Sequence, residues 1–162
     1  MARSKKAGKK EKNRAFSFRV SLTDSPDVWR VVQLRGDQTL EDLHEAICDA
    51  FEWDADHLWA FFMNNRFWDP KEEYGPPEVG EGAGDATETA LESVSLEQGQ
   101  EFCYIFDFGD EWRHDIRVEK AGLPPDGGEY PRIVEEHGAA PQQYPDLDEE
   151  EDDELWDEEE PR

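Results

Sequence analysis

Hydrophobic and polar positions alternate in the first part of the chain that can fold. In residues 15–22, AFSFRVSL, large apolar side chains stand at every second position, which is typical of a half-buried strand. Residues 28–34, VWRVVQL, are rich in β-branched and aromatic side chains and predict a second strand. The turn-forming sequence TDSPD separates them. We therefore expect the two strands to pair as a hairpin.

The period changes in the next segment, DQTLEDLHEAICDAFEW. Leu40, Leu43 and Ile47 recur at helical spacing, and acidic residues occupy the other side. Thr39 is placed to cap the helix N-terminus, because its hydroxyl can accept from a free backbone N–H of the first turn. His44 stands beside the apolar stripe, where we expect a surface histidine rather than a metal ligand.

The remaining pattern predicts short elements. We expect a strand at 57–63, a Pro/Gly-rich loop at 70–86, one short helix at 87–96, strands at 101–108 and 112–119, and a short element at 131–137. The order is ββαβ, then a short helix, then a ββ hairpin. It predicts a single α+β domain, in which one main helix packs on a mixed or antiparallel sheet. The opening ββαβ is similar to the β-grasp plan.

The last hairpin can be placed in register from its side chains. A three-residue loop at Gly109, Asp110 and Glu111 collects the apolar side chains on one face, whereas a two-residue turn at Gly109-Asp110 mixes buried and charged residues on both. The longer loop is therefore favoured. It pairs Phe108 with Trp112, Phe106 with His114, Tyr104 with Ile116 and Phe102 with Val118. On the other face it pairs Asp107 with Arg113 and Cys103 with Arg117.

Charge separates the ends of the chain from its body. Residues 1–14 hold seven Lys or Arg and one Glu, and residues 146–162 hold twelve Asp or Glu and one Arg. Both are too poor in apolar residues to offset the entropy of ordering, so we expect a disordered basic arm and a disordered acidic tail. The domain, 15–145, has 29 acidic and 9 basic residues. This balance disfavours nucleic acid and leaves open either solubility or a basic partner.

The composition also bears on the location of the protein. The N-terminus lacks the apolar stretch of a secretory signal, and no segment approaches membrane-spanning length. Cys48 and Cys103 form neither a disulfide framework nor a metal motif. We therefore expect a cytoplasmic protein that contacts no membrane and uses no cofactor.

Acidic residues and a histidine gather in the last hairpin, which raises the question of a metal site. In the predicted register Asp107 and His114 point to opposite faces and cannot share one ion. Asp110 and Glu111, both in the turn, remain weak candidates for a hard cation. His114 is expected to be a packed histidine whose ring nitrogen meets a backbone carbonyl. No nucleophile elbow, P-loop or zinc-protease motif occurs, so no catalytic residue is assigned.

Several segments occur in an order that resembles the plasmid pRiA4b ORF-3-like family, whose members are also labelled insertion-element passenger TnpR proteins. They are VWRVVQL, TLEDLHEAICDAFEWDADHLWAF, YGPP, YIFDFGDEWRHDIRVEK and YPRIVEEHGAAP. The most specific part is the hairpin signature, formed by Phe106, Asp107, Phe108, Gly109, Asp110, Trp112 and His114. The resemblance implies an α+β domain over about 15–145, associated with mobile elements and without an established activity. Members commonly have cysteines where this chain has Ile133, Ala140 and PQQYPD, so any metal or disulfide that those cysteines form is lost here.

Three functions remain open. The first is a small non-catalytic interaction module that presents an aromatic-rich surface to a protein partner, with Leu155 and Trp156 of the acidic tail as a candidate motif for a basic one. The second is an accessory factor in DNA transactions such as transposition, acting through residues 1–14. The third is an enzyme of unknown reaction.

Three tryptophans follow the predicted helix and the third strand. Trp53, Trp59 and Trp68 are expected in the core.

Overall fold

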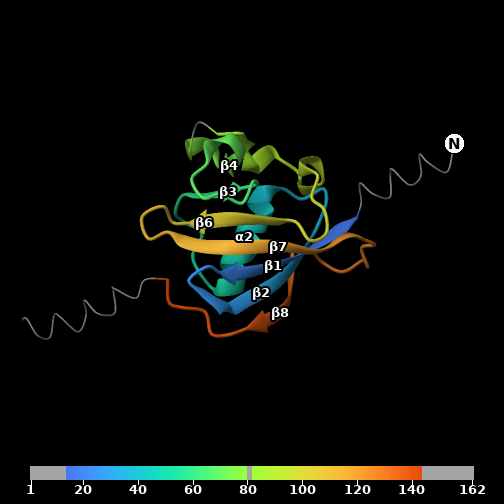
Figure 1. Cartoon of the computed structure of the whole chain (residues 1–162). Coiled ribbons are helices and arrows are strands. Elements are labelled where there is room, and N and C mark those ends of the chain that lie inside the picture. Colours follow the sequence, from blue (N-terminus) through green and yellow to red (C-terminus); the bar gives the residue numbers. More distant parts are fainter. Residues whose placement is uncertain (1–13, 80–81, 144–162) are drawn as a thin grey trace, which may run out of the picture.

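The structure is a computed structural model that describes residues 14–79 and 82–143. Its elements are short, and strands predominate (Figure 1). The strands are β1 (Ala15–Leu22), β2 (Ser25–Arg35), β3 (Trp59–Phe62), β4 (Glu73–Gly75), β5 (Gly84–Asp85), β6 (Glu101–Phe106), β7 (Trp112–Leu123) and β8 (Arg132–His137). The helices are α2 (Leu40–Phe51) and the 3₁₀ turns η1 (Pro70–Glu72), η2 (Pro77–Val79), η3 (Ala86–Glu88) and η4 (Leu91–Val94).

Within the described residues, the strands form one sheet in the order β5-β4-β3-β6-β7-β1-β2-β8. Neighbouring strands are antiparallel except β4 and β5, which are parallel. Helix α2 crosses behind the sheet in Figure 1, so the sheet's other face, its outer face, is turned to the viewer. The coarse prediction is confirmed: one α+β domain with a main helix on a mixed sheet. The β-grasp comparison stays a prediction.

Helix α2 begins where its sequence can satisfy the free backbone N–H groups. The Thr39 hydroxyl accepts from the Asp42 N–H at 3.1 Å, and the Asp42 carboxylate accepts from the Thr39 N–H at 2.9 Å. This is a capping box, with Asp in place of the usual Glu. The helix ends at Phe51, because Glu52 takes a left-handed conformation (φ 63°).

The main core lies between α2 and the sheet. Its largest fully buried side chains include Phe18, Leu34, Leu40, Leu43, Ile47, Phe51, Phe61, Phe102, Tyr104 and Phe106. A second, smaller cluster lies on the outer face and consists of Ala60, Phe62, Cys103 and Ile105. Phe67 and Phe108 pack against this second cluster. The residues of β3 and β6 are therefore buried on both faces, although the helix covers only one.

Arg30 is buried and connects three elements by its guanidinium group. It donates to the carbonyls of Ala50 at the end of α2 (3.1 Å), Trp29 in β2 (2.8 Å) and His137 in β8 (3.0 Å). A cation at a helix C-terminus is favourable, since it faces the negative end of the helix dipole. The strand predicted from VWRVVQL therefore contains a buried, positively charged side chain, which its hydrophobic pattern does not indicate.

Several predicted elements differ in the structure. The prediction of one short helix at 87–96 was wrong, because this segment forms the separate turns η3 and η4. Its backbone bonds elsewhere: the Leu91 N–H donates to the Gln38 carbonyl at 2.8 Å, and the Leu40 N–H donates to the Thr89 carbonyl at 3.0 Å. The segment at 70–86 is not a plain loop, since it contains β4 and β5.

The predicted register of the last hairpin was wrong by two residues. Phe106 pairs with Trp112, Tyr104 with His114, Phe102 with Ile116 and Cys103 with Asp115. The loop therefore has five residues, 107–111, rather than three. Phe102, Tyr104 and Phe106 still share the inner face with their partners, because a shift of two keeps every side chain on its side of the sheet. Asp107 lies in the loop and does not pair with Arg113.

Candidate functional site

A polar network lies inside the main core. His44 and Cys48 stand one helical turn apart on α2, and Tyr104 faces them from β6. A hydrogen bond of 2.6 Å joins His44 Nδ1 to the Tyr104 hydroxyl, and Cys48 Sγ lies 3.9 Å from the former and 3.8 Å from the latter. The His44 ring stacks on Trp59 with 4.0 Å between centroids. The prediction of a surface histidine was therefore wrong: His44 is only 3% exposed.

Burial keeps this network neutral. It lowers the pKa of His44 to about 3 and raises the pKa of Cys48 to about 12. It also raises the pKa of the Tyr104 hydroxyl well above its usual value. A thiol of this kind is a poor nucleophile and such a histidine a poor base near neutral pH. The network is therefore suited to holding α2 on the sheet rather than to catalysis.

His114 is fully buried between Phe51, Trp53 and Tyr104. The sequence prediction of a packed histidine holds. The backbone of Tyr104 and Trp112 lies close enough to favour the protonated ring, yet neither ring nitrogen makes a hydrogen bond of ordinary geometry within the described residues. Burial prevails and lowers the pKa of His114 to about 3.

The family-signature residues divide between this core and an exposed loop. Phe106 and His114 are buried, Trp112 is half-buried, and Asp107 begins the loop. The Asp107 N–H donates to the Leu58 carbonyl at 2.7 Å, and its carboxylate accepts from the N–H groups of Gly109 and Asp110 at 3.0 and 3.2 Å. Asp107 thus both shapes the loop and attaches it to the segment before β3.

The weak cation candidates Asp110 and Glu111 both lie in the loop 107–111. The Glu111 carboxylate accepts from Arg113 at 2.7 Å, and the Asp110 N–H is held by Asp107. In residues 14–79 and 82–143, no group of three His, Cys, Asp or Glu side chains is arranged to hold a metal ion.

An aromatic surface, here called the aromatic ledge, lies beside the loop and consists of the exposed Trp68 and the half-buried Phe67 and Phe108. The Trp68 ring meets Phe108 edge-on at 4.9 Å and Phe62 at 5.9 Å. The Arg113 guanidinium group lies 4.6 Å from the centre of the Phe67 ring. Trp68 is 41% exposed, so its predicted place in the core was wrong, whereas Trp53 and Trp59 are buried. Asn-Asn-Arg before Phe67 is the loop signal that could have indicated this.

Backbone strain gathers at this end of the molecule. Among the described residues, six non-glycine residues have positive φ, and four of them, Asn65, Trp68, Asp107 and Glu111, lie in the two loops that form and flank the ledge. Positive φ is a genuine outlier for a bulky residue such as Trp68 (φ 65°). Such strain persists only where the surrounding structure enforces it, and it often marks functional surfaces.

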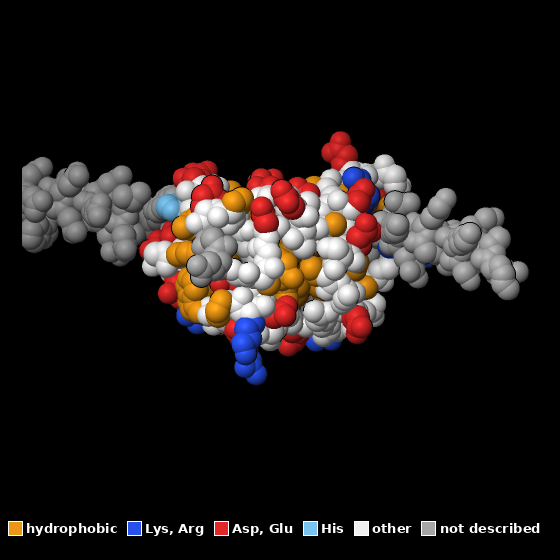
Figure 2. Space-filling model, turned by 90° about the horizontal axis from the view of Figure 1, so that it is seen from above, with side chains coloured by type: hydrophobic (Ala, Val, Ile, Leu, Met, Phe, Trp, Pro, Cys, Tyr) orange, Lys and Arg blue, Asp and Glu red, His pale blue; other side chains and the backbone are white. Residues whose placement is uncertain are grey.

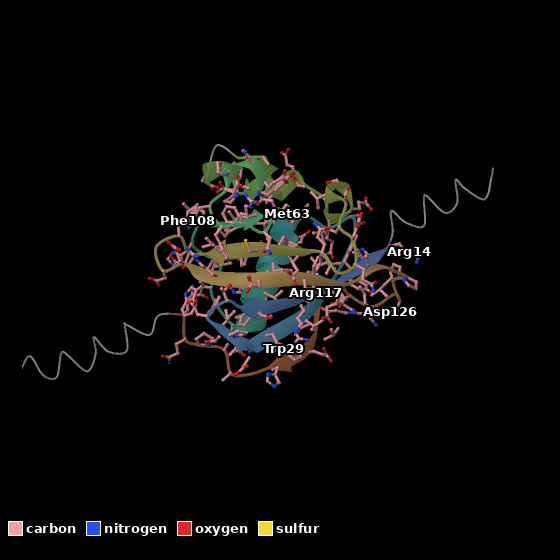
Figure 3. The ribbon with its side chains drawn as sticks, in the orientation of Figure 1. Arg14, Trp29, Met63, Phe108, Arg117 and Asp126 are labelled. Atoms are coloured by element: carbon pink, nitrogen blue, oxygen red, sulfur yellow. The ribbon has the colours of Figure 1, made fainter. Side chains whose placement is uncertain are left out.

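The outer face of the sheet also carries a polar depression of about 570 Å³ over β7 and β1. Arg19 and Arg117 lie directly opposite each other there, and the Arg19 guanidinium group lies 4.0 Å from the centre of the Trp29 ring. Figure 3 shows Arg117 midway along this face and Phe108 at one end of the hairpin. The carboxylates that line the depression are Glu101, Asp115 and Glu119. Its charge is therefore mixed and indicates no single ligand.

Two sets of predictions fall outside the described residues. One is the acidic tail with Leu155 and Trp156, and the other is the basic arm apart from Arg14. Arg14 is described: its guanidinium group donates to the Gly122 carbonyl, and its own carbonyl accepts from the Gly36 N–H at 2.7 Å. None of the described helices is long and apolar enough to cross a membrane.

Sequence comparison agrees with the resemblance of the hairpin signature, because residues 14–146 match the profile of the plasmid pRiA4b ORF-3-like protein. The chain belongs to this family. It is similar to "Uncharacterized protein y4hQ" of Sinorhizobium fredii (strain NBRC 101917 / NGR234), with 36% identity over 118 residues, 72% of this chain and 58% of that protein. The chain therefore spans somewhat over half the length of this curated relative.

A solved structure of the same fold is that of a protein of unknown function, MM3350, from Methanosarcina mazei Go1. It matches with a TM-score of 0.67 and 30% identity, over 81% of this chain and 73% of that one. The names of both relatives state no activity. The comparisons thus show that the chain belongs to the pRiA4b ORF-3-like family and shares its fold with the Methanosarcina protein.

Proposed function

We propose that this domain is a small non-catalytic protein-interaction module and that the aromatic ledge is its contact surface. The observation that carries the proposal is the conformation of Trp68, which is held at φ 65° with 41% of its surface exposed. A strained backbone that places an indole at the surface is costly without a use for the indole. Contact with a partner is such a use.

The composition of the ledge supports this proposal. Trp and Arg are enriched among the residues that contribute most to protein–protein binding, and here Arg113 lies against Phe67 beside Trp68. The rings already rest on the second core cluster, so little side-chain freedom would be lost on binding. A rigid aromatic surface with a neighbouring cation is therefore well suited to a protein partner.

The state of the buried groups favours a non-catalytic role. Burial favours the neutral forms of His44, Cys48, Tyr104 and His114, and it also raises the pKa of Cys103 to about 12. Burial is the largest cause of each shift, and aromatic rings pack against His44, Tyr104 and His114. Both cysteines are buried free thiols, which fits the cytoplasmic location proposed from the sequence.

The experiment compares two tryptophan substitutions in the tagged full-length chain. Trp68→Ala truncates the ledge, and Trp29→Ala makes the same change on β2, where Trp29 stacks on His137 with 5.2 Å between centroids. Each tagged variant is used for affinity capture from a lysate of the cells that express it, and the captured proteins are quantified. We expect Trp68→Ala to lower the recovery of specific partners at least about tenfold, as for a hot-spot residue, and Trp29→Ala to preserve it.

Thermal unfolding of both variants serves as the control, because loss of partners matters only in a folded chain. Partners that remain bound to Trp68→Ala, or that are lost equally from both variants, contradict the ledge as the contact surface.

A further inference from the structure

A second hollow, with a volume of about 390 Å³, is lined by residues from the start of α2, the segment that leads into β3 and the segment after β4. We call it the proline groove. Its apolar floor is formed by Leu58, Trp59, Pro76 and Pro77, and its walls include the carboxylates of Glu41 and Glu78. Leu58 is 41% exposed. An exposed aliphatic side chain next to two prolines is the kind of surface that an extended peptide can cover.

The groove is fixed in place by contacts already described. The Leu58 carbonyl accepts from the Asp107 N–H at 2.7 Å, so the signature loop holds the floor. The rings of Pro76 and Pro77 fix their own φ angles, and β4 pairs with β3 just before them. A preformed groove loses little conformational entropy when it binds, which favours even a short ligand.

The groove is lined by the acidic residues Glu41, Asp56 and Glu78, together with His57, whose Nε2 lies 3.3 Å from the Asp56 carboxylate. It is built from two segments, 36–65 and 72–112, that together contain 20 Asp or Glu and no Lys or Arg. The described residues that line it likewise include no Lys or Arg. In Figure 2, Asp and Glu side chains spread over the upper face, whereas Lys and Arg lie mainly along the lower edge, which is the front of Figure 1.

We infer that the proline groove binds a basic linear segment of a protein partner, with one or two apolar residues between Lys or Arg residues. The apolar side chains would cover Leu58 and the prolines, and the cations would lie against Glu41 and Glu78. Long Lys and Arg stems suit this arrangement, because they cover apolar surface while their charged ends reach carboxylates. This inference rests on the proposed function, since it gives the interaction module a partner of defined chemistry.

The test uses fluorescein-labelled peptides and the full chain. The probe is Lys-Arg-Leu-Leu-Arg-Lys, and the peptide Lys-Arg-Gly-Gly-Arg-Lys has the same charge without the apolar anchor. Fluorescence anisotropy gives the affinity at low and at near-physiological salt. We expect the leucine peptide to bind at least about fivefold more tightly than the glycine peptide, because it alone covers the groove floor, and both to weaken as salt increases.

Matched variants locate the binding. Leu58→Ala and Glu78→Gln change the groove, whereas Val134→Ala and Glu136→Gln make comparable changes on β8, where Val134 is 44% exposed. We expect the combined groove variant to weaken the leucine peptide about fivefold or more and the combined β8 variant to change it less than about twofold. Equal weakening by both pairs, equal affinity for the two peptides, or no binding would each overturn the inference.

The outcome is separable from that of the proposed function. Trp68→Ala leaves the groove intact, so peptide affinity is expected to stay unchanged in this variant. Loss of captured partners with retained peptide binding would support the ledge and the groove as separate sites. If capture of partners depends on Trp68 but the peptide test fails, the groove inference is refuted and the proposed function of the ledge stands.

Discussion

At the scale of single residues, the main core encloses several polar side chains among its aromatic rings, including His44, Tyr104 and His114. His44, Tyr104 and Cys48 satisfy one another, whereas His114 is enclosed by rings and makes no hydrogen bond of ordinary geometry within the described residues. These two situations differ in energy. A buried polar group with a partner is close to neutral for stability, and one without a partner carries its full desolvation cost.

The hydrogen bond in the core network can be tested by removing one hydroxyl. Tyr104→Phe leaves His44 Nδ1 without its 2.6 Å partner. We expect the free energy of unfolding to fall by about 1–3 kcal/mol, because a buried acceptor or donor is left unsatisfied. Urea denaturation measures the change. Tyr130→Phe removes a hydroxyl whose bond to Asp126 is long (3.4 Å) and exposed, so it is expected to change this free energy by less than about 0.5 kcal/mol.

His114 predicts how stability depends on pH. Its pKa is about 3 in the folded chain and near 6.5 when unfolded, so between these values the unfolded chain binds a proton that the folded chain does not. The contribution of neutral His114 to the free energy of unfolding is therefore fully present above about pH 6.5 and is lost as the pH falls towards 3. For this one group the loss amounts to about 2 kcal/mol at about pH 5.

The variant His114→Phe isolates this contribution, because a phenyl ring suits the surrounding aromatic side chains and does not titrate. Urea denaturation at about pH 7.5 and about pH 5 is expected to show a smaller loss for His114→Phe than for the natural chain. An equal loss in both would mean that His114 is protonated in the folded state. His44, with its pKa also lowered to about 3, acts in the same direction and remains in both chains.

At the scale of elements, helix α2 is held at both ends by specific side-chain contacts. Its last turn contains no basic residue, so the helix dipole is not compensated there by a charge of its own. The capping box at Thr39 and Asp42 compensates the N-terminus, and Arg30 reaches the last turn from β2. The helix is thus fixed at both ends by side chains that the hydrophobic pattern does not reveal.

The capping box gives a prediction for this element. Thr39→Ala removes the acceptor of the Asp42 N–H and is expected to lower the free energy of unfolding by about 1 kcal/mol. Ser25→Ala, in an exposed residue at the start of β2, is the control and should change it by less than about 0.5 kcal/mol. Equal effects in urea denaturation would show that the cap contributes nothing specific.

At the scale of the whole molecule, charge works against the compact state. The net charge is −25 at pH 7, and carboxylates lie close together on α2. Burial raises the pKa of Glu45, and the neighbouring Glu41, Asp42 and Asp49 raise it further. Repulsion of this kind keeps copies of the chain apart in solution but destabilises folding, and dissolved salt screens it.

Salt is therefore expected to stabilise the protein. An increase from about 10 mM to about 300 mM NaCl should raise Tm by roughly 5 °C, because the screening length falls well below the size of the domain. Scanning calorimetry of the full chain measures the shift, and Glu45→Gln should reduce it. A Tm that falls with salt would show that attractive ion pairs outweigh the repulsion.

The sequence by itself determined the elements whose side chains repeat with a clear period. It located β1, the capped helix α2 and both strands of the last hairpin, because burial on one face imposes a period of 2 or 3.6 residues on the chain. It also determined the segregation of charge and the family signature. Alternation, however, fixes only which face a side chain takes. Two registers that differ by two residues have the same faces, so the pattern could not choose between them.

Only the tertiary structure decided the register, the state of the histidines and the surface. Asp107 set the five-residue loop by bonding to Leu58, a contact across 49 positions of sequence that no local pattern encodes. His44 is buried because Trp59 and Tyr104 arrive from other strands to enclose it. The aromatic ledge and the proline groove likewise join residues from separate segments. Periodicity records the burial of each residue along one element, whereas a site depends on which elements meet.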